Sequence, residues 1–352
     1  MAPFIVLLFA PYLLSLIVKR DNYEDNRLGR KLTITAFFLI FYLLLAFRSE
    51  YVGTDTQNYK NYFLNAQYTA WSTMPKLSEE PLYFYLQKVV HAVSHDYHLL
   101  LFVTATLSVI PWWLFYNKES DNAVLSIAVF VAVAPFSMFF SGIRQVLAMA
   151  CVVPAWYSVK NKKWFLFVVS VIVAYLFHSS GWIIALILPL YYLKFTKKSL
   201  FFLAPLCAIV LIVNKPLFEF LVKFIGQEDQ VATDTGAYTV LILLIIFVVY
   251  SFFLPREESI DPETRAMRNI LVLAVFIQCF APVHILAMRM NYYFLPIIPV
   301  LISRIARRAR YELEQVANIS VIVMVVFFSF WFLRGLLTGA SLHIVPYRTW
   351  LF

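Results

Sequence analysis

The chain has 352 residues, of which 62% are hydrophobic and only 14% are charged. A soluble domain is about half apolar and about a quarter charged, so this composition excludes a soluble enzyme and a disordered chain. The net charge of +9 is distributed over many short segments and forms no single block. We therefore expect no nucleic-acid partner. The chain is predicted to be an all-α, polytopic membrane bundle that forms one integral membrane domain over residues 1–352.

Apolar stretches of helical length follow one another along the chain. About twelve membrane spans are expected, near residues 2–18, 32–47, 97–116, 122–140, 143–159, 164–177, 180–193, 199–213, 237–254, 269–288, 290–303 and 318–336. The first has no basic segment before it and no cleavage pattern, which favours a retained span over a signal peptide. The pair on either side of His178 could also be a tight or re-entrant hairpin, so the number stays open by one or two.

The lysines and arginines predict the orientation of these spans, because cytoplasmic loops collect positive charge. Nineteen of the 29 basic residues lie in one alternating set of connections, and ten lie in the other. Both termini are therefore expected outside the cytoplasm, together with the two longest hydrophilic connections, 48–81 and 214–236. The three cysteines all lie in apolar stretches, so they predict neither a disulfide framework nor a metal site.

Three arginines depart from this pattern, because they lie near the expected outer ends of spans: Arg48, Arg144 and Arg289. An arginine at the membrane centre costs roughly 2.5 to 3.5 kcal/mol, so it usually faces a cavity or a partner. Each alone could extend to lipid phosphate. Together they favour a binding site, because guanidinium groups pair bidentately with phosphate oxygens. We expect them to bind a lipid-linked phosphate or diphosphate from the outer leaflet.

Candidate acids and bases lie in the same outer segments. Asp55 lies in the polar turn Gly53-Thr54-Asp55-Thr56, Glu80 precedes Pro81, and His178 ends a span. Each could orient or deprotonate a hydroxyl group. The structural alternatives are an Asx turn at Asp55, a helix start at Pro81 and a histidine that only satisfies a hairpin turn.

Aromatic residues of the first long connection are candidates for glycan binding. Tyr59, Tyr62 and Trp71 offer flat faces on which a sugar ring could stack, or they form an interfacial belt. A metal site is permitted by three histidines on one helical face: His91, His95 and His98. No firm carboxylate completes that set, so we expect neither a metal nor another cofactor.

Several short motifs occur in a fixed order from Arg48 to the C-terminus. They are Arg48, Gly53-Thr54-Asp55-Thr56 with Tyr59, Glu80-Pro81 with Tyr83, Ser141-Gly142-Ile143-Arg144-Gln145 with Ala148, Phe177-His178-Ser179-Ser180, Arg289-Met290-Asn291-Tyr292-Tyr293 and Pro346-Tyr347. This ordered set resembles the EpsG family of Wzy-like polysaccharide polymerases. Gly181 departs from the pattern, which has a small apolar residue there, and we expect it to loosen the hairpin.

The resemblance implies a multi-pass glycosyltransferase, similar in fold to glycosyltransferases of type C, in the bacterial cytoplasmic (inner) membrane. Such a polymerase joins oligosaccharide repeat units on undecaprenyl diphosphate at the outer face, during O-antigen, capsule or exopolysaccharide synthesis. Its donor and acceptor are both lipid-linked oligosaccharides, and it uses no metal and no nucleotide sugar. Membrane lipid, a chain-length regulator and a flippase are the further partners that the resemblance implies.

The expected chemistry has two parts. Arg144 and Arg289, with Arg48 third, would hold the diphosphate leaving group, and His178 or Asp55, with Glu80 as the alternative, would accept the acceptor's proton. The competing hypothesis is a flippase for the same lipid, but a flippase commonly shows repeated halves, and we find no internal repeat. A membrane O-acyltransferase would need its histidine on a cytosolic path, whereas this histidine is expected on the outer side.

Overall fold

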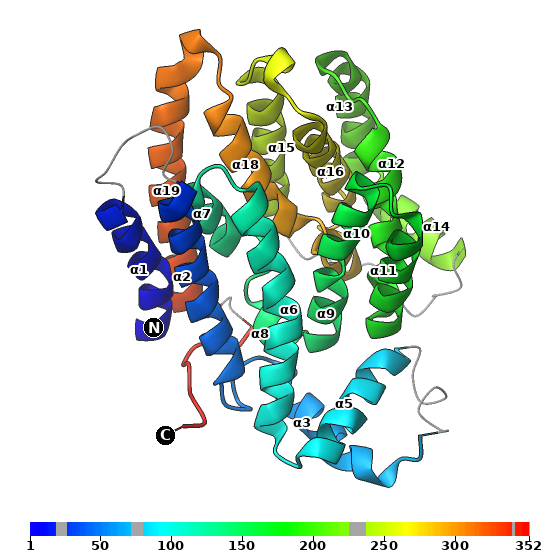
Figure 1. Ribbon diagram of the computed structural model, residues 1–352. Helices are drawn as coiled ribbons and strands as arrows, with labels where there is room; N and C mark the ends of the chain where they lie inside the picture. Colours follow the sequence, from blue (N-terminus) through cyan, green and yellow to red (C-terminus); the bar gives the residue numbers. More distant parts are fainter. Residues whose placement is uncertain (19–26, 72–79, 225–236, 340–341, 352) are drawn as a thin grey trace.

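The computed structural model describes residues 1–18, 27–71, 80–224, 237–339 and 342–351, and its elements there are all helices (Figure 1). By length and composition, three helices in these ranges could cross a membrane: Arg27–Ala46, Tyr97–Glu119 and Tyr311–Leu337. The number rises to five if two bent helix pairs each count as one span. The prediction of an all-helical bundle with membrane-spanning helices is therefore confirmed.

Most of the expected spans correspond to single helices or to pairs of short ones. In chain order they are α1 (Ala2–Val18), α2 (Arg27–Ala46), α6 (Tyr97–Glu119), α7 (Ala123–Val133), α9 (Ile143–Ala150) with α10 (Val152–Lys160), α11 (Trp164–Phe177), η2 (Ser179–Leu186) with α12 (Ile187–Tyr192), α13 (Lys197–Ile212), α15 (Tyr238–Phe253), α16 (Pro262–Gln278), α17 (Ile285–Asn291) with η4 (Leu295–Ile297) and α18 (Ile298–Arg307), and α19 (Glu314–Leu337).

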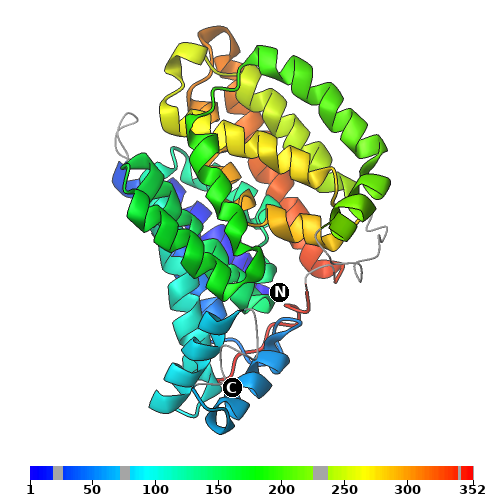
Figure 2. The same cartoon turned by 90° about the vertical axis from the view of Figure 1, so that its right-hand side faces the viewer.

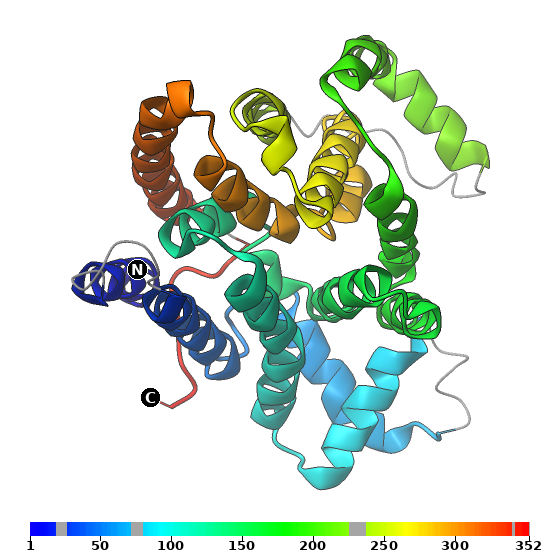
Figure 3. The same cartoon turned by 45° about the horizontal axis from the view of Figure 1, so that its top comes forward.

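The remaining elements connect these helices. They are α3 (Thr56–Asn65), η1 (Ala66–Tyr68), α5 (Pro81–Val93), α8 (Met138–Ser141), α14 (Asn214–Phe224), η3 (Glu257–Ser259) and η5 (Tyr311–Leu313). The two hydrophilic connections thus contain helices, since α3 lies in the first and α14 in the second. Figure 3 shows α1 and α2 at one edge of the bundle and α13 and α14 at the opposite edge.

Several helix boundaries differ from the sequence prediction, among them the break between α16 and α17, which lies at residues 279–284 and not at residue 289. Two of the differences have a clear local cause. The expected span 122–140 ends at Val133, because Ala134 is extended and the following Pro135 cannot continue a helix. The expected span 269–288 begins earlier, at Pro262, where the Asp261 carboxylate accepts a hydrogen bond from the Thr264 amide over 2.8 Å. A search for apolar residues alone misses this polar first turn.

Aromatic side chains join α2 to α7 and to the segment that directly follows α7. Phe41 stacks on Phe136, with ring centroids 5.0 Å apart, and Phe37 meets Phe130 edge to face at 5.7 Å. Such pairs contribute about 0.5–1.5 kcal/mol beyond the area they bury. Close packing of this kind holds helices together in lipid, where the surroundings are as apolar as the side chains.

A polar layer, here called the end cap, closes one end of the bundle and consists of residues 48–71, 80–93 and 342–351. Figure 2 shows α3 and α5 at this end, with the C-terminal segment beside them and the α15–α16 connection at the far end. The Ser49 amide donates to the Arg348 carbonyl over 2.9 Å, and the Tyr347 hydroxyl donates to the Leu44 carbonyl over 3.0 Å. These bonds fix the chain's last segment against the first long connection.

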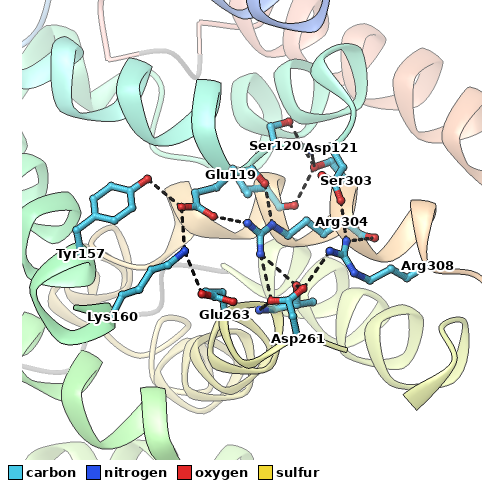
Figure 4. Close-up of polar contacts among 12 residues, drawn as sticks. Glu119, Ser120, Asp121, Tyr157, Lys160, Asp261, Glu263, Ser303, Arg304 and Arg308 are labelled. Carbon is cyan, nitrogen blue, oxygen red and sulfur yellow. Dashed lines mark hydrogen bonds and ion pairs between the residues drawn. The ribbon is translucent and has the colours of Figure 1, made fainter. Parts of the chain in front are cut away.

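The opposite end contains a network of ion pairs in which Glu119 and Arg304 are buried and the other members are partly exposed (Figure 4). Arg304 donates to the Glu119 carbonyl over 2.7 Å, also contacts the Glu119 carboxylate, and lies 3.4 Å from Asp261. Arg308 pairs with Asp121 at 2.6 Å and with Asp261 at 2.9 Å. The network joins the end of α6 to the start of α16 and the end of α18. These arginines belong to the basic set that predicts the cytoplasmic side.

Candidate functional site

A carboxylate–guanidinium pair links the end cap to the bundle. Arg144 is the second residue of α9, directly after the Gly142 break between α8 and α9, and its Nη1 lies 2.5 Å from Glu80 Oε2. Glu80 immediately precedes α5, yet its side chain makes no bond that caps that helix. The helix start at Pro81 is confirmed, but the Glu80 carboxylate points to the bundle. The Glu80 side chain is 10% exposed and that of Arg144 is 34% exposed, so solvent reaches the pair mainly from the arginine side.

Glu80 also contacts the turn that follows α11. Its Oε1 accepts a hydrogen bond from the Ser179 amide over 3.1 Å and lies 3.7 Å from His178 Nδ1. Glu80 thus joins an arginine, a backbone donor and an imidazole from two parts of the chain that lie far apart in sequence. We refer to Glu80, Arg144, His178 and the neighbouring Arg289 as the Glu80 cluster.

Hydrogen bonds hold the His178 ring in one orientation. Its Nδ1 accepts from the Ser180 amide over 3.3 Å and lies 2.8 Å from Ser180 Oγ, which in turn lies 3.0 Å from the Tyr293 hydroxyl. Because a backbone N–H can only donate, the proton of a neutral His178 lies on Nε2. Burial lowers the pKa of His178 below the usual 6.5. The negative charge of Glu80 raises this pKa, whereas the positive charges of Arg144 and Arg289 lower it.

Gly181 allows this turn to pack closely. A Cβ atom at Gly181 would lie 2.4 Å from the carbonyl of Ala174 in α11, and the Gly181 amide donates to the His178 carbonyl over 2.7 Å. The expectation that this glycine loosens the hairpin is therefore wrong, because the residue is buried against α11 and permits a contact that no side chain would allow.

Arg289 approaches the cluster from α17. The Gln145 side chain, next to Arg144 on α9, donates to the Arg289 carbonyl over 2.7 Å and so ties the two helices together. Arg289 is close enough to lower the pKa of His178. Within the described ranges its guanidinium has no hydrogen bond or ion pair, and the residue is half-buried. It is therefore the arginine of this group that can most readily accept a new anion.

Arg48 lies in a different environment. It is 2% exposed, its Nη1 donates to the Leu45 carbonyl over 3.3 Å, and its guanidinium carbon is 5.7 Å from the centroid of the Phe140 ring. An isolated bridge also joins Arg48 to Thr349 of the C-terminal segment. Arg48 is thus surrounded by protein at the base of the end cap, and a ligand would reach it only if that cap moved.

The turn Gly53-Thr54-Asp55-Thr56 packs against the α8–α9 break. Gly53 has a φ of +101°, and a Cβ there would lie 2.1 Å from the Phe140 carbonyl oxygen. The Thr54 amide donates to Ser141 Oγ over 3.0 Å, which places this turn beside the start of α9. Asp55 is half-buried and its side chain makes no cap bond to α3. Two of the ordered motifs are therefore in direct contact.

The three aromatic candidates are not equivalent. Tyr59 is 5% exposed and lies beneath Arg144, whose guanidinium carbon is 5.9 Å from the ring centroid. Tyr62 and Trp71 are each 49% exposed, and Trp71 stacks on Tyr85 with an interplanar angle of 14°. Tyr62 and Trp71 are thus the exposed members, although Lys88 Nζ lies 5.1 Å from the Trp71 ring centroid, whereas Tyr59 supports the arginine.

The histidines of α5 and α6 divide into two groups. The His91 and His95 rings have centroids 4.4 Å apart, whereas His98 pairs with Asp96 at 2.7 Å and stacks on Trp350. In the part of the chain that the structure describes, no group of three or more His, Cys, Asp or Glu side chains is arranged to hold a metal ion.

The structure adds residues that the sequence did not single out as site residues. Ser180, Tyr293 and Gln145 lie inside the ordered motifs. Ser180 contacts His178, Tyr293 contacts Ser180, and Gln145 contacts Arg289, which gives those motif positions a physical role. Gln87 lies outside the motifs. Its amide donates to the Tyr59 carbonyl over 3.2 Å, and the only sequence signal is its i+4 spacing from Tyr83 on α5.

A protein-family model described as the EpsG family matches residues 31–349 of the chain. The match includes every residue of the Glu80 cluster and confirms the resemblance derived from the ordered motifs. No curated protein and no solved structure gave a significant match.

Proposed function

Because the chain belongs to the EpsG family, we propose that it is a Wzy-like polymerase that joins undecaprenyl-diphosphate-linked oligosaccharide repeat units. The observation that carries this proposal is the Glu80 cluster. Two guanidinium groups, a carboxylate and an imidazole converge there from α5, α9, α17 and the turn after α11. This combination suits transfer of a sugar from a diphosphate leaving group to a hydroxyl.

In this proposal the arginines bind the diphosphate in sequence. Arg289, which has no partner among the described residues, accepts the diphosphate first. Arg144 then exchanges its contact with Glu80 for a second phosphate oxygen, since phosphate offers the same bidentate geometry as a carboxylate. His178 donates from Nε2 to the same group, because Nδ1 already accepts from Ser180.

Release of Glu80 from Arg144 couples donor binding to base activation. The acceptor's hydroxyl oxygen attacks the anomeric carbon of the donor sugar, and the bond from that carbon to the diphosphate oxygen breaks. The electron pair leaves with the diphosphate, and the hydroxyl proton passes to Glu80. Asp55 is the alternative base, because it is half-buried and no cap bond occupies its carboxylate. Electrostatic stabilisation of the leaving diphosphate supplies the larger part of the rate.

The other candidates take supporting positions. Tyr62 and Trp71 offer their exposed faces to the glycan, while Tyr59 holds Arg144 from below. Arg48 fixes the C-terminal segment to the base of the end cap through its contacts with Leu45 and Thr349. Neither role requires a metal ion, and the proposed step uses none.

We further propose a topology of about twelve spans, similar to glycosyltransferases of type C, in the bacterial cytoplasmic membrane. Several helices have fewer than the roughly 20 residues that a span needs, which local bilayer thinning and paired short helices would accommodate. The Arg304 network would face the cytoplasm, and the end cap and both termini would face outward. A flippase would supply the lipid-linked units, and a chain-length regulator would set the product size.

The experiment that tests this function uses the purified protein with a synthetic lipid-diphosphate oligosaccharide, with chelator present and without nucleotide sugar. We expect a ladder of products. Arg144→Ala and Arg289→Ala should each slow the ladder by about 100- to 1,000-fold, the loss typical of one donor to a developing anion. Lys60→Ala is the control, because Lys60 pairs with Glu50 in the end cap, away from the cluster.

The outcomes separate this proposal from the flippase. A flippase would move labelled lipid across a liposome bilayer and leave its glycan length unchanged. Absence of a ladder together with lipid movement would overturn the polymerase. Wild-type ladders from both arginine variants would remove the proposed diphosphate site while leaving the family assignment in place.

A further inference from the structure

An apolar cavity of about 250 Å³ lies between α7, α15, α17 and α19. Its lining includes the Val131–Ser137 stretch at the end of α7, Met288 and Tyr292 near the end of α17, and Trp331 and Gly335 near the end of α19. Met288, Tyr292, Trp331 and Gly335 are all partly exposed, so the cavity is open to its surroundings. It lies in the half of the bundle that contains the end cap.

The cavity and the Glu80 cluster share α17. Met288 and Tyr292 are four residues apart, so they lie on one face of the helix, and both line the cavity. Arg289 lies between them in sequence, and its charge acts on His178 of the cluster. One turn of helix therefore carries an apolar surface and, on the adjacent face, a guanidinium group without a partner in the described ranges.

Gly335 leaves part of this cavity empty. A Cβ atom at Gly335 would have no atom within 4 Å. Glycine inside a helix costs about 1 kcal/mol relative to alanine, and here no close packing compensates for it. The atoms that line an empty apolar space also lose dispersion contacts. A ligand that fills the cavity would recover those contacts.

We propose that this cavity, here called the tail cavity, holds the isoprene units next to the diphosphate of the polyprenyl carrier while Arg289 binds the diphosphate. The proposal rests on the proposed polymerase function and adds the location of the lipid. A 150 Å³ apolar cavity holds benzene, so about 250 Å³ has room for roughly ten carbons, or two isoprene units. In the carrier, branched isoprene units adjoin the diphosphate dianion. In the protein, the apolar lining at Met288 and Tyr292 adjoins the Arg289 cation in the same way.

The test measures how the rate depends on tail length. Donors carry the same oligosaccharide on dimethylallyl, geranyl or undecaprenyl diphosphate, and the variants are Gly335→Leu and the smaller Gly335→Ala. Wild type should show a large fall in KM from dimethylallyl to geranyl. In Gly335→Leu the KM for the geranyl and undecaprenyl donors should rise about tenfold or more, while the KM for the dimethylallyl donor, whose single isoprene unit fills only part of the cavity, should rise less. Gly335→Ala should fall between wild type and Gly335→Leu.

A second measurement does not depend on the variant's folding. A photoreactive diazirine on the first isoprene unit of the donor should label Met288 or Trp331 in the wild-type protein. Labelling confined to other helices, or equal labelling of these residues by a diazirine phospholipid in competition, would overturn the proposal. So would a Gly335→Leu protein that treats all three donors as wild type does. If wild type elongates none of the donors, the polymerase function itself fails, which is a distinguishable result.

Discussion

Glu80→Gln is the substitution that most directly tests the proposed coupling between diphosphate binding and base activation. Glutamine keeps the shape and can still accept from the Ser179 amide, which lies 3.1 Å from the carboxylate. It loses the negative charge and the basicity. If Glu80 is the base, kcat should fall about 100- to 10,000-fold, which is about 2.7–5.5 kcal/mol of activation free energy. The free energy of unfolding should fall by less than about 2 kcal/mol. Arg144 loses its ionic partner in this variant, but its side chain is 34% exposed, so solvent screens the charge.

The assay is the initial rate of ladder formation at saturating donor, with thermal unfolding in detergent as the measure of folding. Glu50→Gln is the matched control, since Glu50 also pairs with a cation of the end cap, Lys60, at 2.9 Å. The control should retain the wild-type rate. A Glu80→Gln protein that keeps more than about a tenth of the wild-type kcat would refute the reasoning, because even a weak general base contributes more than that. A loss confined to KM would limit Glu80 to a role in donor binding, and the base would then be Asp55.

Three further predictions concern the same structure. Because burial lowers the pKa of His178 below 6.5, the imidazole stays neutral at pH 7, and the acid limb of the pH–rate profile should lie below pH 6.5. The rate falls there because Nδ1 gains a proton and can no longer accept from the Ser180 amide. Ser180→Ala should reduce kcat about tenfold through loss of ring positioning and should move that acid limb, whereas a merely structural role would leave the limb in place. Arg304→Met should lower the free energy of unfolding by about 3 kcal/mol, because the buried Glu119 carboxylate keeps only the more distant cation Lys160, at 3.7 Å. Thermal unfolding measures this loss, and activity at low temperature should be retained.

Most helices could be predicted because each coincides with a long apolar stretch, although only three to five in the described ranges are long and apolar enough to cross a membrane. Two boundaries were missed where a single polar residue or proline decides them. Pro135 ends α7 inside a continuous apolar stretch, and Asp261 begins α16 inside a charged one. Both boundaries depend on local sequence, so a prediction that considers helix caps and prolines together with hydropathy would place them correctly.

The site was predictable only in its composition. Glu80, Arg144 and His178 are all visible as unusual polar residues near span ends, but nothing in their spacing shows that they touch. Glu80 and Arg144 are 64 positions apart, and their contact depends on how α5 folds back over the end of the bundle. The alternatives left open for Glu80 also differ only in where its side chain points, which is a property of tertiary packing.

Arg48, Arg144 and Arg289 show how partner geometry separates residues that look equivalent in sequence. Arg48 is enclosed by protein and donates to a backbone carbonyl, Arg144 already has a carboxylate, and the Arg289 side chain has no hydrogen bond or ion pair within the described ranges. The binding free energy of an incoming dianion is largest at an arginine that has no existing partner, because breaking an existing ion pair costs part of the new interaction. Arg289 should therefore dominate donor affinity. Arg144 must exchange Glu80 for phosphate, so its contribution should appear mainly in kcat, where the freed carboxylate takes the proton.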